Sequence, residues 1–390
     1  MNSVAIIGGG PAGLIAADRL AATHEVHVYE QGRTLGRKFL VAGEGGLNIT
    51  NSAAGEELIA HYSPPDRMRE ILEAFGPAEL RAWLEGLGVP PYVGSSGRVF
   101  PERGIKPAEV LKAIMERVND NGVFVHTDHR FVGFDDEVRP LVEHAGTRAV
   151  IEAKIVVFAL GGASWPKTGS TGTWTKHFES IGVRTVPFRA SNCGVEVDLS
   201  DAIRVHAGKP LKNVAVSCGE RSVRGEVTIT EYGLEGNAIY PLVPAIREAL
   251  EAGAAEITLD LKPDLTAEQI DDKLKDAAWK ERMSALRLDR PSVTLLKTFT
   301  PFERYVDGRT MAEDVKRVQI PVTGLRPIAE AISTVGGIAL DQVSPNLSLI
   351  MHPHLFVAGE MLDWDAPTGG FLLQGAFSTG HWAAAAIVKR

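Results

Sequence analysis

The chain has 390 residues, of which 44% are hydrophobic and 23% are charged, the proportions of an ordinary globular protein with two or three domains. Its formal net charge of -8 provides no broad basic surface, which disfavours nucleic acid as a partner but leaves room for a local basic groove. No apolar stretch approaches the length that spans a bilayer, and a strand-like run that begins at Val4 leaves no space for a signal peptide, so we expect a cytoplasmic protein without membrane contact.

The first thirty residues predict one βαβ unit. A strand at 4–7 is followed by a glycine turn, a helix from Pro11 to about Thr23 and a second strand at 25–30. A glycine-rich loop is expected over 32–51. The next helices are predicted at 67–75, 78–87 and 107–119.

The hydrophobic period changes beyond residue 120, where short strands joined by polar turns are predicted at 123–125, 130–134, 140–143 and 149–152. The continuous apolar run at 155–160 indicates a buried parallel strand. Further strands are predicted at 214–217, 226–230 and 256–261, and charged helical stretches at 266–288 and 311–317. The glycine-bearing apolar pattern of the first part returns at Thr334.

These patterns predict an α/β fold with two domains. Residues 1–186 and 331–390 form a discontinuous Rossmann-like domain, and residues 187–330 form an inserted domain that is β-rich at 187–262 and 318–330 and helical at 263–317.

The dinucleotide motif G-x-G-x-x-G occupies residues 8–13, between the first predicted strand and helix. Gly8 permits the tight turn, Gly10 lets the backbone approach a diphosphate, and Gly13 lets the helix pack close to the strand. Pro11 suits the first helical position because no N–H is needed there. The free N–H groups of this helix start are expected to face the diphosphate.

Glu30 ends the second strand, 20 residues after Gly10, where an acid can accept hydrogen bonds from the adenosine ribose. This first half of the site suits NAD or FAD equally. The antiparallel strands predicted between 123 and 153 favour FAD, because simple NAD dehydrogenases continue with regular βαβ repeats, whereas FAD proteins of the glutathione-reductase type carry such a meander.

The last part of the chain predicts the second half of a flavin site. A buried strand at 355–358 ends in Gly359 and Glu360, and the acid is placed to bond hydroxyls of an extended cofactor. Gly369 and Gly370 then lead into a helix at 371–388, so its first N–H groups are uncovered. Aimed at the N1–C2 carbonyl edge of a flavin, this helix start would stabilise the reduced ring.

The sequence resembles a family of bacterial NAD(P)/FAD-dependent flavoproteins that includes bile-acid reductase-like and aminoacetone oxidase-like proteins. The resemblance covers most of the chain and is carried by motifs at 8–13, 36–38, 48–51, 97–101, 161–172, 232–234, 322–324, 359–363 and 369–371. One departure is that many relatives have Gly-Gly-Gly-Arg-Cys-Asn where this chain has Gly-Glu-Gly-Gly-Leu-Asn at 43–48, so an arginine and a thiol are missing beside the expected ring.

The resemblance implies a glutathione-reductase-type FAD domain split by an inserted β-barrel-like domain that carries a small helical part. It also places Arg37, Lys38, Asn48 and Asn51 near the phosphates, ribitol or ring. Together with the motifs above, the predicted residues for non-covalent FAD binding are Gly8, Gly10, Pro11, Ala12, Gly13, Glu30, Gln31, Arg37, Lys38, Gly43, Gly45, Asn48, Thr50, Val125, Ala159, Gly161, Gly162, Gly359, Glu360, Gly369, Gly370 and Phe371.

Residues for the chemistry are harder to choose, because hydride transfer belongs to the flavin and the protein adds orientation and a proton donor. The candidates are Arg98, as a bidentate ligand of a carboxylate or phosphate, Lys106 and Lys167, as orienting groups or proton donors, and Tyr232, as a proton donor or a cover over the ring. Each also fits an ordinary surface or core role. Cys193 and Cys218 form no C-x-x-C pair, and no metal-site or hydrolase motif is found in the sequence.

We therefore expect an FAD-dependent oxidoreductase that holds a small-molecule or bulky ring substrate between its two domains. A reductase of C=C or C=N bonds is one interpretation, and a flavin amine oxidase or dehydrogenase is another. A flavin-binding regulatory protein with little turnover is the third. No second G-x-G-x-x-G follows a strand, so a dedicated NAD(P)H domain is not expected. Either NAD(P)H donates electrons transiently from the substrate pocket, or the electrons come from the substrate itself. These patterns specify no oligomeric state.

Overall fold

The computed structural model describes residues 3–43, 46–94, 96–307 and 310–390. It divides into two compact units, the first comprising residues 1–189 and 332–390 and the second residues 190–331. In the described part of the chain, no helix is both long and apolar enough to cross a bilayer.

The first unit is built on a parallel sheet of five strands in the order β20-β10-β1-β2-β6. The strands are β1 (Ser3–Ile7), β2 (Glu25–Tyr29), β6 (Phe124–His126), β10 (Ile155–Phe158) and β20 (Leu355–Val357). The central strands are almost wholly buried, as expected for a parallel sheet that is covered on both faces. Their register places Ile7 beside Phe158 and Phe158 beside Val357, so these three strands end at the same edge.

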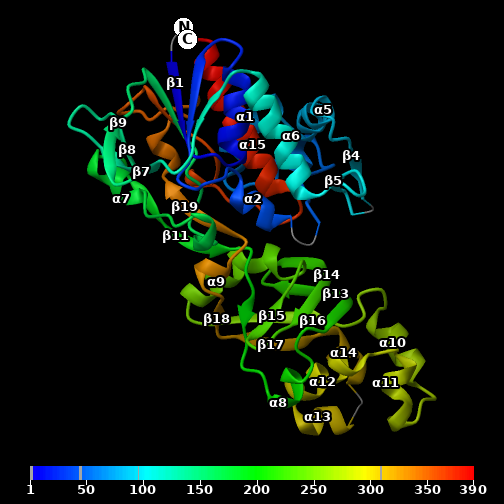
Figure 1. The fold of residues 1–390 in the computed structure, drawn as a ribbon. Coiled ribbons are helices and arrows are strands. Elements are labelled where there is room, and N and C mark those ends of the chain that lie inside the picture. Colours follow the sequence, from blue (N-terminus) through cyan, green and yellow to red (C-terminus); the bar gives the residue numbers. More distant parts are fainter. Residues whose placement is uncertain (1–2, 44–45, 95, 308–309) are drawn as a thin grey trace. The chain divides into compact units, whose positions relative to one another are not determined.

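Helix α1 (Pro11–Leu20) packs against α6 (Pro107–Asp120) and α15 (Phe371–Val388), so the two ends of the chain share one layer (Figure 1). The other α-helices of this unit are α2 (Arg37–Ala42), α3 (Gly55–Ile59), α4 (Pro65–Ala74), α5 (Pro77–Gly86) and α7 (Thr175–Ser180). Helix α2 corrects the prediction of a continuous loop at 32–51. It is only six residues long and packs on α6, so tertiary contact forms it and not a local sequence pattern.

Three small sheets complete the first unit. The first contains β3 (Thr50–Asn51), β5 (Arg98–Pro101) and β4 (Pro91–Val93), and the second is the antiparallel meander β7 (Arg130–Phe134), β8 (Pro140–His144) and β9 (Thr147–Val150). The third pairs β11 (Thr185–Ser191) with β19 (Ser333–Ile338). The meander is the feature from which the sequence favoured FAD over NAD.

The second unit contains a seven-stranded antiparallel sheet in the order β17-β16-β13-β14-β15-β12-β18. Its strands are β12 (Val195–Glu196), β13 (Pro210–Cys218), β14 (Arg221–Ile229), β15 (Gly233–Glu235), β16 (Ala255–Asp260), β17 (Val318–Val322) and β18 (Gly324–Leu325). The two edge strands, β17 and β18, are separated only by Thr323. The sheet therefore curls until its edges meet in one segment, which gives the barrel-like form.

The helices of the second unit are α8 (Asp201–Arg204), α9 (Val243–Glu251), α10 (Ala267–Leu274), α11 (Arg282–Ala285), α12 (Arg290–Phe299), α13 (Phe302–Asp307) and α14 (Met311–Lys316). The predicted helical stretch at 266–288 is therefore broken into separate helices. A new helix then begins where the Asp289 side chain accepts a hydrogen bond from the N–H of Ser292 (2.9 Å), an N-cap that local periodicity had not revealed.

Candidate active site

Three loops meet at the carboxyl edge of the parallel sheet, the edge at which α/β proteins bind nucleotides. They follow β1, β10 and β20, and contain residues 8–10, 159–162 and 358–360. Ala159 is buried, and its N–H donates to the carbonyl of Ile7 (2.8 Å). Val125, which was also predicted to bind the cofactor, is half-buried in β6 and pairs with Val28. The sheet register thus brings glycine loops from both ends of the chain together.

The three motif glycines have different surroundings. A Cβ added to Gly8, whose φ is +112°, would lie 2.2 Å from the carbonyl oxygen of Ala159. A Cβ on Gly13 would lie 2.0 Å from the carbonyl oxygen of Gly8. A Cβ on Gly10 would meet no protein atom within 4 Å. Gly8 and Gly13 are therefore required by packing, whereas Gly10 keeps the start of α1 open to a ligand.

Glu30 holds the motif loop in place. Its Oε2 accepts the N–H of Gly9 (2.9 Å) and its Oε1 accepts the N–H of Gly32 (2.8 Å). Burial raises the pKa of Glu30, and the two backbone hydrogen bonds and the charge of Arg37 oppose that rise. Each carboxylate oxygen has a second lone pair, so the predicted acceptance of ribose hydroxyls remains compatible with these contacts.

Lys38 and Glu360, predicted separately as cofactor residues, form an ion pair (2.7 Å). The Lys38 Nζ also donates to Ser164 Oγ (2.7 Å), and Glu360 Oε1 accepts the N–H of Thr334 (2.9 Å). A Cβ on Gly162 would lie 2.1 Å from Thr334 Oγ1. The pair therefore ties the loop after β20 to α2, and Ser164 and Thr334 are polar members of this cluster that the sequence did not single out.

Two helix starts border the site, and neither has a side-chain cap. Helices α1 and α15 cross where a Cβ on Gly380 would lie 2.2 Å from the carbonyl oxygen of Ala12. Gly380 is nine residues after Phe371, so the start of α15 lies about 14 Å of helix beyond the start of α1, at about 1.5 Å per residue. Two positive helix ends this far apart suit an extended dinucleotide rather than a single phosphate.

The sequence also predicted Thr50 and Phe371 as cofactor residues, and the structure corrects this for their side chains. Thr50 is fully buried and its hydroxyl donates to Gln374 Oε1 (2.5 Å). Phe371 is 5% exposed and stacks on His61 with ring centroids 4.1 Å apart. Both side chains are held within the protein, so they support the start of α15 and do not face a ligand.

Other predicted cofactor residues lie around the site with structural contacts. Gln31 donates to the carbonyl of Gly169 (2.8 Å) and Arg37 to that of Lys167 (2.7 Å), so both hold the 165–169 loop. Gly43 is buried, and a Cβ there would lie 2.3 Å from a side-chain carbon of Pro107, so glycine is required at this position by packing against the start of α6. Gly45 lies outside the described residues.

The remaining glycines shape the loops. The carbonyl of Gly161 accepts a hydrogen bond from Trp174 Nε1 (3.0 Å), and the N–H of Gly359 donates to Thr379 Oγ1 (2.9 Å). Gly369 and Gly370 both have positive φ, and a Cβ on Gly370 would lie 2.2 Å from the carbonyl oxygen of Thr50. The glycine pair is therefore needed to bring β3 against the start of α15.

Asn48 has an unmade hydrogen bond. Its Nδ2 donates to the carbonyls of Thr50 (2.7 Å) and Val99 (3.0 Å), while its Oδ1 is buried without a partner. A buried acceptor without a partner costs about 1–3 kcal/mol, so such atoms are often associated with ligand sites.

The four candidates for the chemistry lie in different environments. Arg98 is half-buried in β5, Lys106 is exposed at the start of α6, and Lys167 is exposed. Tyr232 belongs to the second unit, where its hydroxyl donates to Glu235 Oε2 (2.6 Å) and burial raises its pKa. The residues described in 3–43, 46–94, 96–307 and 310–390 contain no His, Cys, Asp and Glu cluster suited to a metal ion.

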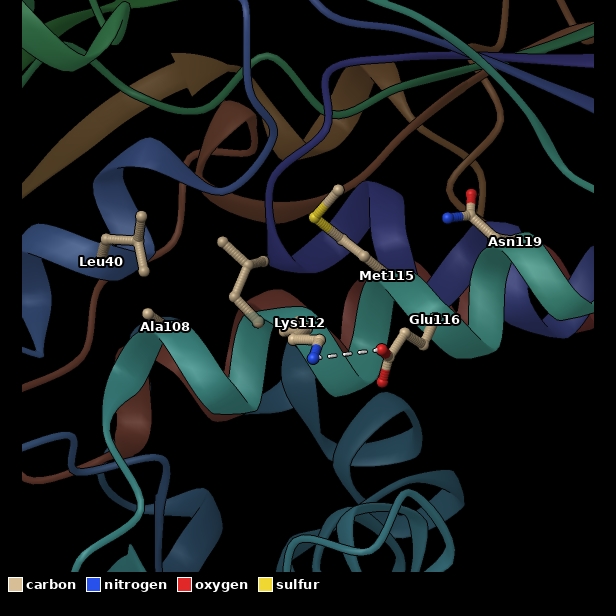
Figure 2. Close-up of a pocket in the computed structure, with 7 residues that line it drawn as sticks. Leu40, Ala108, Lys112, Met115, Glu116 and Asn119 are labelled. Carbon is tan, nitrogen blue, oxygen red and sulfur yellow. Dashed lines mark ion pairs between the residues drawn. The ribbon is translucent and has the colours of Figure 1, made fainter.

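A groove of about 300 Å³ lies along α6 (Figure 2). It is lined by Leu40, Ala108, Leu111, Lys112, Met115, Glu116 and Asn119. None of the residues predicted for FAD or for catalysis lines it, so the groove is not part of the candidate active site.

Known structures share this fold. A 3-ketosteroid Δ4-(5α)-dehydrogenase from Rhodococcus jostii RHA1, solved with 4-androstene-3,17-dione, is similar with a TM-score of 0.52, 16% identity, and coverage of 100% of this chain and 97% of that chain. A 3-ketosteroid Δ1-dehydrogenase from Sterolibacterium denitrificans is similar with a TM-score of 0.54 and 13% identity, and the match covers all of both chains.

The fold and the relatives of this chain identify it as an FAD-dependent oxidoreductase. The chain belongs to the HI0933-like protein Rossmann domain family, which matches residues 2–386. It is 25% identical over 412 residues to a 3-dehydro-bile acid Δ(4,6)-reductase of Clostridium scindens, with full coverage of both proteins. It is 23% identical over 407 residues to a ribosomal RNA dihydrouridine synthase of Haemophilus influenzae, covering 99% of this chain and 98% of the relative.

Proposed function

We propose that this protein is an FAD-dependent reductase of ring C=C bonds conjugated to a carbonyl group. The observation that carries this proposal is that relatives matching the whole chain are named for such reactions: one for a Δ(4,6)-reduction of a 3-dehydro-bile acid, the other for making dihydrouridine. The two named substrates differ in size and charge, but in each a ring double bond is conjugated to a carbonyl. The common reaction is thus the better guide to this chain than either substrate.

The residues of the candidate site fit FAD. The open position at Gly10 and the uncapped start of α1 would hold the diphosphate, and Glu30 would accept the adenosine ribose. The Lys38–Glu360 pair joins α2 to the loop after β20 and would contact the ribitol. When bound, FAD would supply the two-electron hydride chemistry, and the protein would supply orientation and a proton.

Reduced nicotinamide is the proposed electron donor. The chain has a single G-x-G-x-x-G after a strand, so the nicotinamide would bind transiently and leave before the substrate enters. The substrate would be a small cyclic enone, which requires no basic surface and agrees with the net charge of -8.

A uridine in RNA is the second candidate substrate, and one observation favours it. The helical part of the second unit is locally basic, since residues 273–304 carry eight Lys and Arg against four Asp and Glu. Within it Trp279 is 40% exposed, and the Arg282 guanidinium lies 5.3 Å from the Trp279 ring centroid. Exposed aromatic rings among cations are typical of surfaces that bind single-stranded nucleic acid.

Anaerobic stopped-flow spectroscopy on the FAD-loaded protein tests the proposal. NADPH or NADH is expected to bleach the flavin rapidly, and a 3-oxo-Δ4 steroid or a uridine-containing RNA is then expected to restore its colour. Recovery with the steroid alone identifies the cyclic enone as the substrate class, and recovery with the RNA alone identifies the second candidate. If reduced nicotinamide bleaches the flavin only slowly, and added dioxygen restores its colour rapidly while neither the steroid nor the RNA does, the protein is an oxidase instead.

A further inference from the structure

Arg98 has a charge without a partner. Its side chain is half-buried in β5, yet no hydrogen bond or ion pair joins its guanidinium to a described residue. Arg326 differs, because it binds Glu196 and Glu330 and its guanidinium also covers the Tyr232 ring, whereas Arg81 is likewise half-buried and its Nε has no partner among the described residues. Removing a cation from water without an acceptor is costly, so the unpaired state of Arg98 points to a group that is added later.

The location of Arg98 narrows the choice of that group. Arg98 pairs with Asn51 across β5 and β3, and the Asn51 Nδ2 donates to the carbonyl of Gly369 (2.9 Å). The Nε of Arg98 lies 3.8 Å from the position of a Cβ on Gly369. Gly369 immediately precedes Gly370, the N-cap of α15. The guanidinium is therefore held beside the positive end of an 18-residue helix.

Two positive features placed side by side repel each other unless an electron-rich group lies between them. No carboxylate of the described residues pairs with Arg98, so none of those residues supplies such a group. A cation and a helix N-terminus in this arrangement stabilise an oxygen that carries or develops negative charge. The site therefore stabilises a ligand group that carries negative charge and does not stabilise a neutral apolar one.

The distance between the two helix starts indicates which group of the cofactor carries this negative charge. The start of α1 is suited to the diphosphate, and the start of α15 lies about 14 Å of helix further on, beside the opposite end of an extended cofactor. In FAD that end is the flavin, whose pyrimidine ring carries the negative charge of the reduced form at its N1–C2=O edge.

We propose that Arg98 is the counter-charge for the N1–C2=O edge of the flavin and acts together with the N-terminus of α15. This inference rests on the proposed binding of FAD. Arg98 thereby stabilises the reduced ring and sets the midpoint potential, and its role is separate from that of any proton donor to the substrate.

Sulfite provides a test that needs no substrate, because it adds to oxidised flavin and leaves negative charge on the pyrimidine ring. Arg98→Gln removes the charge, Arg98→Lys keeps it, and Arg103→Gln is the matched control, since Arg103 is an exposed residue of the same region. FAD content and thermal unfolding are measured first, and then the sulfite Kd and the midpoint potential.

We expect Arg98→Gln to raise the sulfite Kd by roughly tenfold or more, and each tenfold change in the reduction equilibrium corresponds to a fall in two-electron midpoint potential of about 30 mV. Arg98→Lys should stay within about threefold of the wild type, and Arg103→Gln should be unchanged. Equal sulfite affinity and potential for Arg98→Gln and the wild type would overturn the inference, even if a substrate KM rose.

Two further outcomes are also decisive. If Arg98→Gln folds but retains no FAD while Arg98→Lys retains it, the charge acts on the cofactor as proposed. If both variants fold and lose FAD alike, the arginine shape and not its charge is required, and the inference is wrong. Failure of the wild type itself to bind FAD would refute the proposed function before Arg98 is compared.

Discussion

The substitution Gly10→Val is expected to weaken FAD binding strongly while it leaves the fold intact. Gly10 has φ -84° and ψ -176°, an extended conformation that valine adopts readily. Its Cβ would meet no protein atom within 4 Å. Two small effects on stability oppose each other: the loss of glycine at an N-cap costs about 0.5–1 kcal/mol, and the lower entropy of the unfolded chain returns about 0.4–1 kcal/mol.

The valine side chain has a large steric cost only when the cofactor binds. The added side chain occupies the space that a diphosphate needs at the start of α1, and a steric overlap of about 3 kcal/mol weakens binding roughly 100-fold. Gly13→Ala provides the contrast. Its Cβ would lie 2.0 Å from the carbonyl oxygen of Gly8, so the clash is within the protein, and the free energy of unfolding should fall by about 3 kcal/mol with or without FAD.

The assay measures the thermal unfolding of each apoprotein and the Kd for FAD by quenching of flavin fluorescence. We expect Gly10→Val to unfold within a few degrees of the wild type and to lose FAD, while Gly13→Ala unfolds earlier. FAD binding by Gly10→Val as tight as that of the wild type, or unfolding as early as that of Gly13→Ala, would contradict this prediction.

Other substitutions separate binding from stability. Lys38→Met leaves Glu360 without its cation and should weaken FAD binding roughly tenfold, whereas Lys112→Met, which breaks an exposed ion pair, should change neither FAD binding nor stability by more than about 0.5 kcal/mol. Glu30→Ala leaves two backbone N–H groups unpaired, so urea unfolding should show that the free energy of unfolding falls by about 1–3 kcal/mol. FAD titration should show weaker binding, and unchanged flavin content would contradict the ribose assignment. Burial lowers the pKa of His381 from 6.5 to about 4, so the unfolded chain takes up the proton first and stability falls as the pH drops from 6.5 toward 4. At pH 5 this loss of stability is at most about 2 kcal/mol, and solvent screening reduces it to about 1 kcal/mol. Urea unfolding of His381→Leu should therefore show a smaller loss of stability between pH 7 and pH 5 than the wild type does. An unchanged pH dependence would contradict the assignment.

Local patterns in the sequence were enough to predict the dinucleotide motif and the last helix. The motif combines a buried strand, a glycine turn and Pro11 within a few residues, and α15 spans the predicted residues 371–388. Such elements are specified by their own residues, through periodicity and the backbone freedom of glycine.

The contacts within the site could not be predicted in the same way. Lys38 and Glu360 are 322 positions apart, and Thr50 and Gln374 are 324 apart, so no local pattern links them. The sequence placed Lys38 and Glu360 correctly in one region because both lie in family motifs, but their pairing depends on the sheet register. Thr50 was misassigned for the same reason: a motif gives proximity to a site and does not show which way a side chain points.

The most direct test of the account is the flavin content of the purified protein after incubation with FAD and removal of the excess. The two helix starts and the glycine loops between them predict a yellow protein with one FAD per chain, and a loss of that colour in Gly10→Val but not in a surface variant such as Lys112→Met. A wild-type protein that stays colourless, or that binds NAD with equal stoichiometry and excludes FAD, would contradict it.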